Sequence, residues 1–207
     1  MTSLPQALVA QLRETVADER VLAAMATMPR DRFVNAEDVQ RAYENVALPI
    51  DCGQTISQPV VVARMLQLLE LAPGDQVLDV GTGSGYHAAL LSKLAGHVWT
   101  IERHPGLSAR ARQILDQLGI ANVTCVTGDG SMGLPAHAPF QAINVAAAAG
   151  PRLPEALAEQ LADGGRLLVP LGGEDQHLYR VRRIAARLEG ERFERVRFVP
   201  LVSDRPD

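Results

Sequence analysis

Acidic residues and closely spaced glycines occur together between residues 77 and 102, in a pattern that predicts binding of a nucleoside-bearing cofactor. The apolar run 77–80 contains Asp79 and ends in a G-x-G-x-G turn over residues 81–85. A helical pattern follows, and then a second apolar run that ends on Glu102. A strand, a glycine turn, a helix and a second strand form a βαβ unit, and a carboxylate at the tip of the second strand is well placed to bind ribose hydroxyls.

The spacing of the glycines separates two kinds of cofactor. A dinucleotide-binding turn has a third small residue at the position where this chain has Tyr86. Asp79 would repel a pyrophosphate, but it would attract the ammonium and sulfonium of S-adenosylmethionine. Glu102 lies 21 positions beyond Gly81 (102 − 81), close to the roughly 20 expected of a ribose-binding carboxylate. These features favour S-adenosylmethionine over a nicotinamide dinucleotide, and they disfavour a turn that serves the fold alone.

A further candidate lies where the third predicted strand ends. In an open α/β sheet the ligand binds outside the carboxyl ends of the strands. Asp129 follows that strand, between Gly128 and Gly130, and its carboxylate can accept a hydrogen bond from an adenine amino group. Taken alone, Asp129 would be a turn residue. Because it falls in register with Asp79 and Glu102, we interpret it as a cofactor contact.

The elements that must position these residues begin with helices. Apolar residues at helical spacing predict helices over 4–16, 18–28 and 59–71, with Ser3 and Gln6 at capping-box spacing before the first. An irregular stretch, a short helix and a loop without periodicity are expected at 30–34, 37–43 and 46–58. Loops of that length are often functional.

From residue 76 onward, strands alternate with helices. The strands are expected at 76–80, 97–101, 122–126, 141–146 and 165–170, and the helices between them at 86–95, 105–118 and 154–162. Such alternation implies an α/β fold whose mostly parallel sheet is covered on both faces. The last two strands, 176–183 and 192–201, leave no room for a helix and should pair antiparallel at one edge.

Composition and charge exclude several classes of function. The 207 residues are 47% hydrophobic with a formal net charge of −4, which suits a single domain and disfavours a nucleic-acid partner. No apolar run reaches the length of a membrane span and Met1–Gln6 does not resemble a secretory signal, so no membrane partner is expected. Cys52 and Cys125 fall in unlike contexts, which predicts free thiols and a cytoplasmic location. The five histidines lack metal-ligand spacing, so we expect surface or satisfied structural histidines and no metal.

Three motifs, in order along the chain, carry a resemblance to a known family. They are Pro-Arg-x-x-Phe-Val at 29–34, Gly-Gln-Thr-Ile-Ser-Gln-Pro at 53–59 and Asp-Val-Gly-Thr-Gly-Ser-Gly-Tyr at 79–86. With them the chain resembles the protein-L-isoaspartate O-methyltransferase family from about Met28 to Leu201. The Gln-Thr-Ile-Ser-Gln-Pro run is specific to this family rather than shared by methyltransferases in general.

The resemblance implies a Rossmann-like, S-adenosylmethionine-dependent methyltransferase fold with N-terminal helices and an antiparallel C-terminal edge. We expect one domain over 1–207, with the N-terminal helices and a substrate loop at 1–58 and the cofactor-binding sheet at 59–207. The implied reaction is methyl transfer to the α-carboxylate of isoaspartyl residues in damaged proteins or peptides. The ester then cyclises to a succinimide that reopens partly to aspartate. We expect the protein to be a monomer.

Ser57 is the active-site residue that the resemblance implies, within a substrate-binding run of Gln54, Thr55, Ile56 and Ser57. A carboxylate with a pKa of about 4 is already ionised at neutral pH, so Ser57 need only orient it. Because Ser57 precedes Pro59, it could instead cap the helix that Pro59 opens. The predicted cofactor-binding residues are Asp79, Gly81, Thr82, Gly83, Gly85, Glu102, Arg103, Asp129 and Gly130.

The substrate range stays open because several positions depart from the usual pattern of the family. One alternative is a specialised carboxyl methyltransferase that acts on one dedicated peptide or on an unmodified aspartate. Another is a noncatalytic relative that binds the cofactor or isoaspartate. An amine-modifying enzyme is disfavoured because residues 146–151 lack an Asn/Asp-Pro-Pro-aromatic turn. The departing positions are Ser131, Leu134, Gln141, Asn144 and Ala146.

Overall fold

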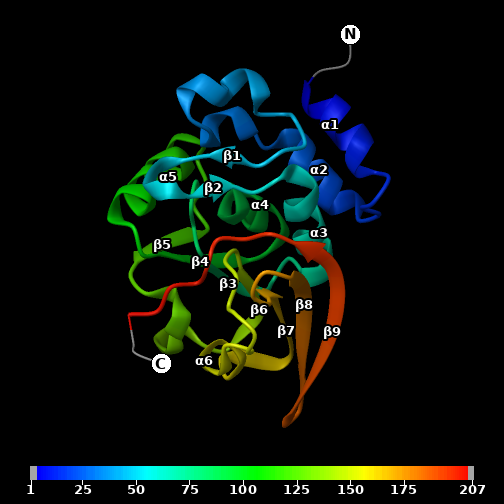
Figure 1. The fold of residues 1–207 in the computed structure, drawn as a ribbon, viewed down its shortest axis with the longest axis vertical. Helices are drawn as coiled ribbons and strands as arrows, with labels where there is room; N and C mark the ends of the chain where they lie inside the picture. Colours follow the sequence, from blue (N-terminus) through cyan, green and yellow to red (C-terminus); the bar gives the residue numbers. More distant parts are fainter. Residues whose placement is uncertain (1–3, 205–207) are drawn as a thin grey trace.

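A seven-stranded mixed sheet forms the centre of the molecule (Figure 1). The computed structural model describes residues 4–204, and the expected Ser3 cap lies outside them. The strands are β3 (Gln76–Val80), β4 (His97–Glu102), β5 (Val123–Thr127), β6 (Phe140–Val145), β7 (Leu161–Leu171), β8 (Gln176–Ile184) and β9 (Arg187–Val196). Their order is β5-β4-β3-β6-β7-β8-β9, and only the pairs β7–β8 and β8–β9 are antiparallel. This arrangement confirms the predicted fold class.

The direction in which strands are added reverses at β3. Strands β4 and β5 lie on one side of β3, and β6 to β9 lie on the other. Helix α4 (Tyr86–Leu94) connects β3 to β4, and helix α5 (Pro105–Gln117) connects β4 to β5. Such a reversal leaves a crevice beyond the carboxyl end of β3, and this is where open α/β sheets bind their ligands.

Two apolar clusters cover the two faces of the sheet, because successive strand residues point to opposite sides. Val77 belongs to one cluster and Leu78 to the other. The first cluster packs against α4, α5 and the N-terminal helices α1 (Leu4–Leu12), α2 (Glu19–Thr27) and α3 (Pro59–Leu69). The second is covered by the single turn α6 (Glu155–Ala158) and by the loop that carries the short 3₁₀ helices η4 (Gly130–Met132) and η5 (Pro135–His137). Both faces are covered, as predicted, but most of the helical mass lies on one of them.

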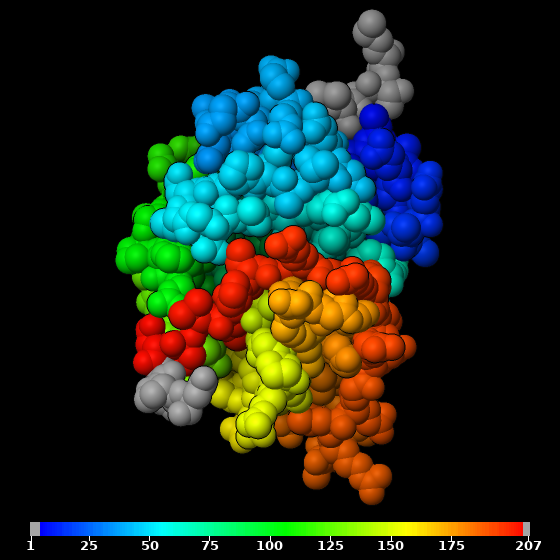
Figure 2. Space-filling view, in the orientation of Figure 1, coloured from blue at the N-terminus to red at the C-terminus, as the bar shows by residue number. Residues whose placement is uncertain are grey.

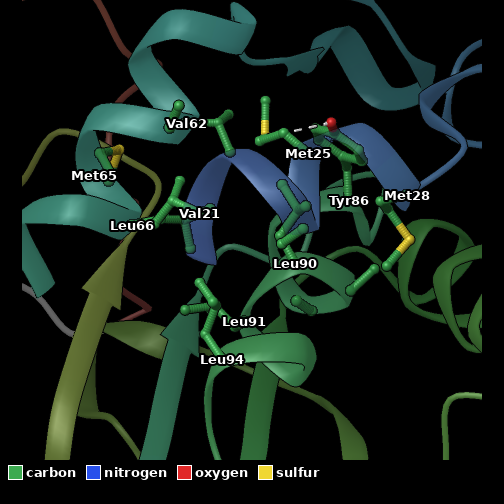
Figure 3. Packing of buried hydrophobic residues seen from close by; sticks show 14 of the residues in the cluster. Val21, Met25, Met28, Val62, Met65, Leu66, Tyr86, Leu90, Leu91 and Leu94 are labelled. Atoms are coloured by element: carbon green, nitrogen blue, oxygen red, sulfur yellow. Dashed lines mark hydrogen bonds between the residues drawn. The ribbon is translucent and has the colours of Figure 1, made fainter. Parts of the chain in front are cut away.

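Helices α2, α3 and α4 share a buried apolar core (Figure 3). Met25 of α2 faces Tyr86 at the start of α4, and the Tyr86 hydroxyl donates to the Met25 sulfur at 3.6 Å. Leu66 of α3 and Leu90 of α4 belong to the same cluster. This packing joins the helix that follows the glycine turn to the N-terminal helices. Within residues 4–204, no helix is both long and apolar enough to span a bilayer.

Several segments differ from the sequence prediction. Residues 30–34 and 37–43 form the 3₁₀ helices η1 (Arg30–Phe33) and η2 (Ala36–Arg41). The loop at 46–58 contains a third, η3 (Asp51–Gly53), at the tip of a hairpin in which β1 (Leu48–Pro49) pairs antiparallel with β2 (Thr55–Ile56). The helix expected at 154–162 is only the turn α6, because the backbone is already paired as β7 from Leu161. The strand expected at 192–201 is β9, which begins and ends about five residues earlier.

The chain after β9 crosses the carboxyl ends of the strands, and we call residues 197–204 the strap. Ala148 N donates to Val199 O and Leu201 N donates to Ala148 O, each at 2.8 Å, so that Pro200 lies beside Ala148. Figure 2 shows the strap as a red band between the N-terminal part of the molecule, in cyan, and the later part of the chain, in yellow and orange. The segment read from the sequence as a strand end therefore leaves the sheet and covers the crevice.

Candidate functional site

A cavity of about 370 Å³ lies at the carboxyl ends of β3 and β4, between the hairpin, the glycine turn and the strap. All four residues of the predicted substrate run, 54–57, line it. Of the nine predicted cofactor residues, six line it: Gly81, Thr82, Gly83, Glu102, Arg103 and Gly130. The other three, Asp79, Gly85 and Asp129, lie next to it without forming its wall. Tertiary structure thus brings the substrate run, which ends at Ser57, together with cofactor candidates that lie between Gly81 and Gly130 in the sequence.

The turn between β3 and α4 requires glycine for two reasons. Gly81, Gly83 and Gly85 have φ angles of 92°, 53° and 89°, a region that residues with side chains rarely adopt. A Cβ on Gly85 would also lie 3.0 Å from Ala111 Cβ on α5. Gly85 therefore allows α4 and α5 to pack closely, whereas Gly81 and Gly83 bring backbone to the cavity wall.

Glu102 is oriented by two backbone donors. Its Oε2 accepts from Gly83 N at 2.9 Å and its Oε1 accepts from His104 N at 3.0 Å. The side chain is only 5% exposed, yet it lines the cavity. Each carboxylate oxygen has a second lone pair. Glu102 can therefore accept from a ribose diol without losing its own supports.

Asp79 lies fully buried beneath the glycine turn. Its Oδ2 accepts from Thr100 Oγ1 at 2.8 Å and its Oδ1 accepts from Asn144 Nδ2 at 2.7 Å. Thr100 in turn bonds Thr82 Oγ1 at 2.6 Å, and Thr82 lines the cavity. Burial raises the pKa of Asp79 to about 6, although the bonds from Asn144 and Thr100 favour the carboxylate. Hydrogen bonds thus link Asp79 to the cavity wall through Thr100 and Thr82, and a direct contact between Asp79 and the cofactor stays a prediction.

Asp129 holds the end of the strap. One of its oxygens accepts from Ser131 N at 2.8 Å and the other from Asp204 N at 2.9 Å, while Arg103 pairs with the Asp204 carboxylate at 3.1 Å. Partial burial acts to raise the pKa of Asp129, but these backbone N–H groups hold it below its usual value. Gly130 beside it lines the cavity. A contact between Asp129 and an adenine stays a prediction.

Ser57 lies on the hairpin side of the cavity with a free hydroxyl, because it makes no hydrogen bond within residues 4–204. The N-cap of α3 is Gln58, whose side chain makes no capping bond. Asn45 Oδ1 instead accepts from Val60 N in the first turn of α3, at 3.0 Å. The interpretation of Ser57 as a helix cap is therefore wrong.

The 29–34 motif joins the hairpin side to the glycine turn through Arg30. This side chain is fully buried, and it donates from Nε to Ala42 O at 2.7 Å and from Nη2 to Val46 O at 3.3 Å. Its guanidinium lies 5.1 Å from the centre of the Tyr86 ring, which also packs against Phe33 at 5.4 Å. Burial lowers the pKa of Arg30 to about 10. Tyr86, the residue that excludes a dinucleotide turn, also anchors the N-terminal segment.

Arg110 ties the tip of the hairpin to helix α5. It donates to Asn35 Oδ1 at 2.8 Å, to Val34 O at 2.9 Å and to Asp51 Oδ2 at 3.1 Å. The Asp51 side chain is 63% exposed, so this pair is open to water. The buried Arg30 thus fixes the segment before the hairpin, and the partly buried Arg110 holds the hairpin tip.

Several lining residues were not predicted from the sequence, among them the strap residues 199–202 and His87. The contact between the strap and the cavity was not predicted because the apolar residues of the strap resemble a strand. His87 is 7% exposed; its Nδ1 lies 3.3 Å from Asn144 Nδ2, and its Nε2 has no partner in the described part of the chain. Burial lowers its pKa to about 4. The sequence feature that could have indicated a site role for His87 is its position, two residues after the last glycine of the turn.

Two of the five departures from the family pattern lie at the site. Asn144 bonds Asp79, and Ala146 lines the cavity. Ser131, Leu134 and Gln141 lie outside the lining. Among residues 4–204, no three His, Cys, Asp or Glu side chains are grouped so that they could hold a metal ion.

Known proteins share this chain's sequence pattern. The family model described as Protein-L-isoaspartate(D-aspartate) O-methyltransferase (PCMT) matches residues 3–206. A protein-L-isoaspartate O-methyltransferase of Koribacter versatilis is 54% identical over 196 residues, which cover 94% of this chain and 88% of the relative. One from Erwinia tasmaniensis is 49% identical over 198 residues, or 95% of each chain.

Solved structures share the fold. A protein-L-isoaspartate O-methyltransferase superposes with a TM-score of 0.87 at 27% identity over 97% of this chain, which spans 66% of that longer chain. A structure described as a protein-L-isoaspartate O-methyltransferase (PCMT) from Plasmodium falciparum, in complex with S-adenosyl-L-homocysteine, superposes with a TM-score of 0.83 at 26% identity. That comparison covers 95% of this chain and 97% of the other.

Proposed function

Since this chain belongs to the protein-L-isoaspartate(D-aspartate) O-methyltransferase family, we propose that it transfers the methyl group of S-adenosylmethionine to the α-carboxylate of isoaspartyl residues in proteins or peptides. The observation that carries the proposal is a single cavity with the glycine turn and Glu102 on one wall and Ser57 on the other. A group can pass directly between two ligands only when both are held in one space.

The chemistry of the first wall fits S-adenosylmethionine. Glu102 supplies carboxylate oxygens for the ribose hydroxyls, and the buried anion of Asp79 favours a cationic ligand. Gly81 and Gly83 allow the backbone to approach the ligand closely. When bound, the cofactor supplies an electrophilic methyl group on a sulfonium. The other proposed cofactor-binding residues, at the turn and the strand tips, are Thr82, Gly85, Arg103, Asp129 and Gly130.

The second wall orients the carboxylate that accepts the methyl group. A free α-carboxyl has a pKa of about 3.3–3.7, so it is ionised at neutral pH and needs no general base. The free hydroxyl of Ser57 donates to one carboxylate oxygen and leaves the other to attack the methyl carbon. Orientation of this kind contributes roughly 7–11 kcal/mol in favourable systems. Gln54, Thr55 and Ile56 line the same wall and contact the peptide on either side.

The methyl ester then sets up repair. Methanol is a far better leaving group than oxide, so the backbone nitrogen of the next residue attacks the ester carbonyl and expels methanol. The product is a succinimide, which water reopens partly to a normal aspartyl linkage. No residue of this chain is needed for that step.

Methyl incorporation into matched peptides tests the proposal. The isoaspartyl and aspartyl versions of one peptide are incubated with methyl-labelled S-adenosylmethionine and the purified chain. We expect base-labile label in the isoaspartyl version only. Equal labelling of the aspartyl version would favour the specialised carboxyl methyltransferase. No labelling of either, with S-adenosylhomocysteine still bound, would favour the noncatalytic relative.

We further propose that the protein works as a monomer in the cytoplasm. One chain supplies the whole cavity wall, so a second copy is not needed to complete it. The free thiol of Cys52 is exposed, which suits a reducing compartment. Sedimentation at working concentration tests the first statement, and a stable dimer would contradict it.

A further inference from the structure

Helix α4 begins at the cavity wall, and its second residue carries an unpaired polar atom. Tyr86 and His87 are the first two residues of this nine-residue helix, and both line the cavity. His87 Nε2 is buried and has no partner among residues 4–204. The backbone N–H groups and the dipole at a helix N-terminus favour an anion. An unpaired buried nitrogen at the same place calls for a physical account.

Asn144 determines which ring nitrogen of His87 carries the proton. A carboxylate only accepts, so the group 2.7 Å from Asp79 Oδ1 must be the amide NH₂ of Asn144. The same Nδ2 lies 3.3 Å from His87 Nδ1, and its second hydrogen is available to that nitrogen. Nδ1 therefore accepts, and in a neutral ring the proton lies on Nε2. Burial lowers the pKa of His87 to about 4, so the ring is neutral at pH 7.

Asn144 and His87 are the last two members of a continuous series of hydrogen bonds beneath the glycine turn. The series links Thr82, Thr100, Asp79, Asn144 and His87 in that order. The two outer members line the cavity and the three inner ones do not. Because Thr100 donates to Asp79, it must accept from Thr82, whose oxygen then remains free to accept from a ligand. The series thus ends in an acceptor at Thr82 and a donor at His87.

We propose that the Nε2–H of His87 and the N-terminus of α4 bind a ligand carboxylate in the cavity, with Asn144 as the positioning residue. The inference rests on the proposed function, which brings two carboxylates into this space. One is at the methionine end of S-adenosylmethionine and the other is the α-carboxylate of the isoaspartyl residue. A donor at His87 and an acceptor at Thr82 complement the first, because an amino-acid end carries both a carboxylate and an ammonium.

Binding to His87 variants tests the inference. His87→Leu removes the donor, and His87→Gln keeps an N–H donor at a similar reach. The ligands are S-adenosylhomocysteine and 5′-methylthioadenosine, which lacks the amino-acid end. If the cofactor is the source of the carboxylate, His87→Leu lowers the affinity for S-adenosylhomocysteine by about 10- to 100-fold and leaves the affinity for methylthioadenosine unchanged. His87→Gln then recovers most of the lost affinity.

If the substrate is the source, both nucleosides keep their affinities and the KM for the isoaspartyl peptide rises by a similar factor in His87→Leu. His97→Leu is the matched control, since His97 lies at the other end of β4 and outside the lining. An equal loss for both nucleosides, or no loss of any kind, overturns the inference while the unmodified chain still binds S-adenosylhomocysteine. An unmodified chain that binds neither nucleoside contradicts the proposed function and this inference with it.

Nitrogen NMR of the histidine rings tests the role of Asn144 directly. We expect His87 of the unmodified chain to be neutral and protonated at Nε2 at pH 7. Asn144→Leu removes the donor to Nδ1, so the two tautomers mix. A ring protonated at Nδ1 in the unmodified chain, or a tautomer that does not respond to Asn144→Leu, overturns the assignment.

Discussion

The two walls of the cavity are built in different ways. The wall with the glycine turn and Glu102, called the cofactor wall after its proposed ligand, stands on parallel strands. There the buried Asp79 accepts hydrogen bonds from the equally buried Thr100 and Asn144. The wall that carries Ser57, called the substrate wall after its proposed ligand, is a hairpin of two-residue strands. Its tip is held by the solvent-exposed ion pair Arg110–Asp51. Buried polar networks tolerate little rearrangement, whereas water readily replaces an exposed pair. The fold therefore preorganises the cofactor side and leaves the peptide side easier to open.

The walls are not independent, because Arg30 spans them. It holds two carbonyls of the segment before the hairpin and lies over the Tyr86 ring at the start of α4. Removing its guanidinium would leave both carbonyls without their donor. Arg30 therefore couples the segment before the hairpin to the start of α4.

Glu102→Ala should break the cofactor wall with the largest effect. The ribose loses its carboxylate, and the N–H groups of Gly83 and His104 lose their acceptor. Hydrogen bonds to charged groups contribute about 1.5–3 kcal/mol each, so affinity for S-adenosylhomocysteine should fall by about 100-fold or more in calorimetry. Glu189→Ala on the exposed edge strand is the control. Unchanged affinity in Glu102→Ala would exclude the assigned role.

Two opposed titrations in the cofactor wall predict a pH signature. The pKa of Asp79 is raised to about 6, so the folded state binds the proton more readily and stability falls as pH rises from about 4 to 6. The pKa of His87 is lowered to about 4, so the unfolded state binds the proton more readily and stability rises between about pH 4 and 6.5. The two slopes nearly cancel in the unmodified chain.

His87→Gln should expose the uncancelled slope of Asp79. Relative to the unmodified chain, the variant should lose roughly 3 kcal/mol of unfolding free energy between pH 4 and 6.5, at about 1.4 kcal/mol per pKa unit. Urea unfolding of both chains at matched pH values measures the difference, in which all other groups cancel. Parallel stability curves would contradict the burial of a neutral His87.

Ser57→Ala should affect the substrate wall without reaching the cofactor. The lost hydrogen bond to the substrate carboxylate should lower turnover by about 10- to 100-fold, with the affinity for S-adenosylhomocysteine unchanged. Ser92→Ala, a helix serine that bonds Ala89 O, provides the matched control. Weaker cofactor binding with unchanged turnover per bound enzyme would contradict this role and place Ser57 with the cofactor instead.

Asp51→Ala should give the smallest effect, because exposed ion pairs contribute about 1 kcal/mol or less. We expect a few-fold change in the KM for peptide, no change in cofactor affinity, and a difference that shrinks in about 0.5 M salt. Asp175→Ala, which removes an exposed pair with Arg195, is the control. A loss of more than tenfold would show that the hairpin is as rigidly held as the opposite wall.

The local elements of the cofactor side could be predicted from the residues alone. The predicted strand 76–80 matches β3 at both ends, and the glycine turn and the tip at Glu102 lie where the spacing placed them. Apolar periodicity and the conformational needs of glycine are properties of neighbouring residues, so they can be read along the chain. The motif at 53–59 located Ser57, although it did not reveal that the hydroxyl is free.

The contacts between distant segments could not be predicted in this way. Asp79 is fully buried, and one of its hydrogen-bond donors is Asn144, its in-register neighbour on β6, 65 positions along the chain. Asn144 also contacts His87, which lies 57 positions away in the sequence. The strap, near the end of the chain, lines the same cavity. These outcomes depend on strand order and register, which pair residues through space. No local pattern encodes them, because the partner of each buried polar group is chosen only when the whole sheet has assembled.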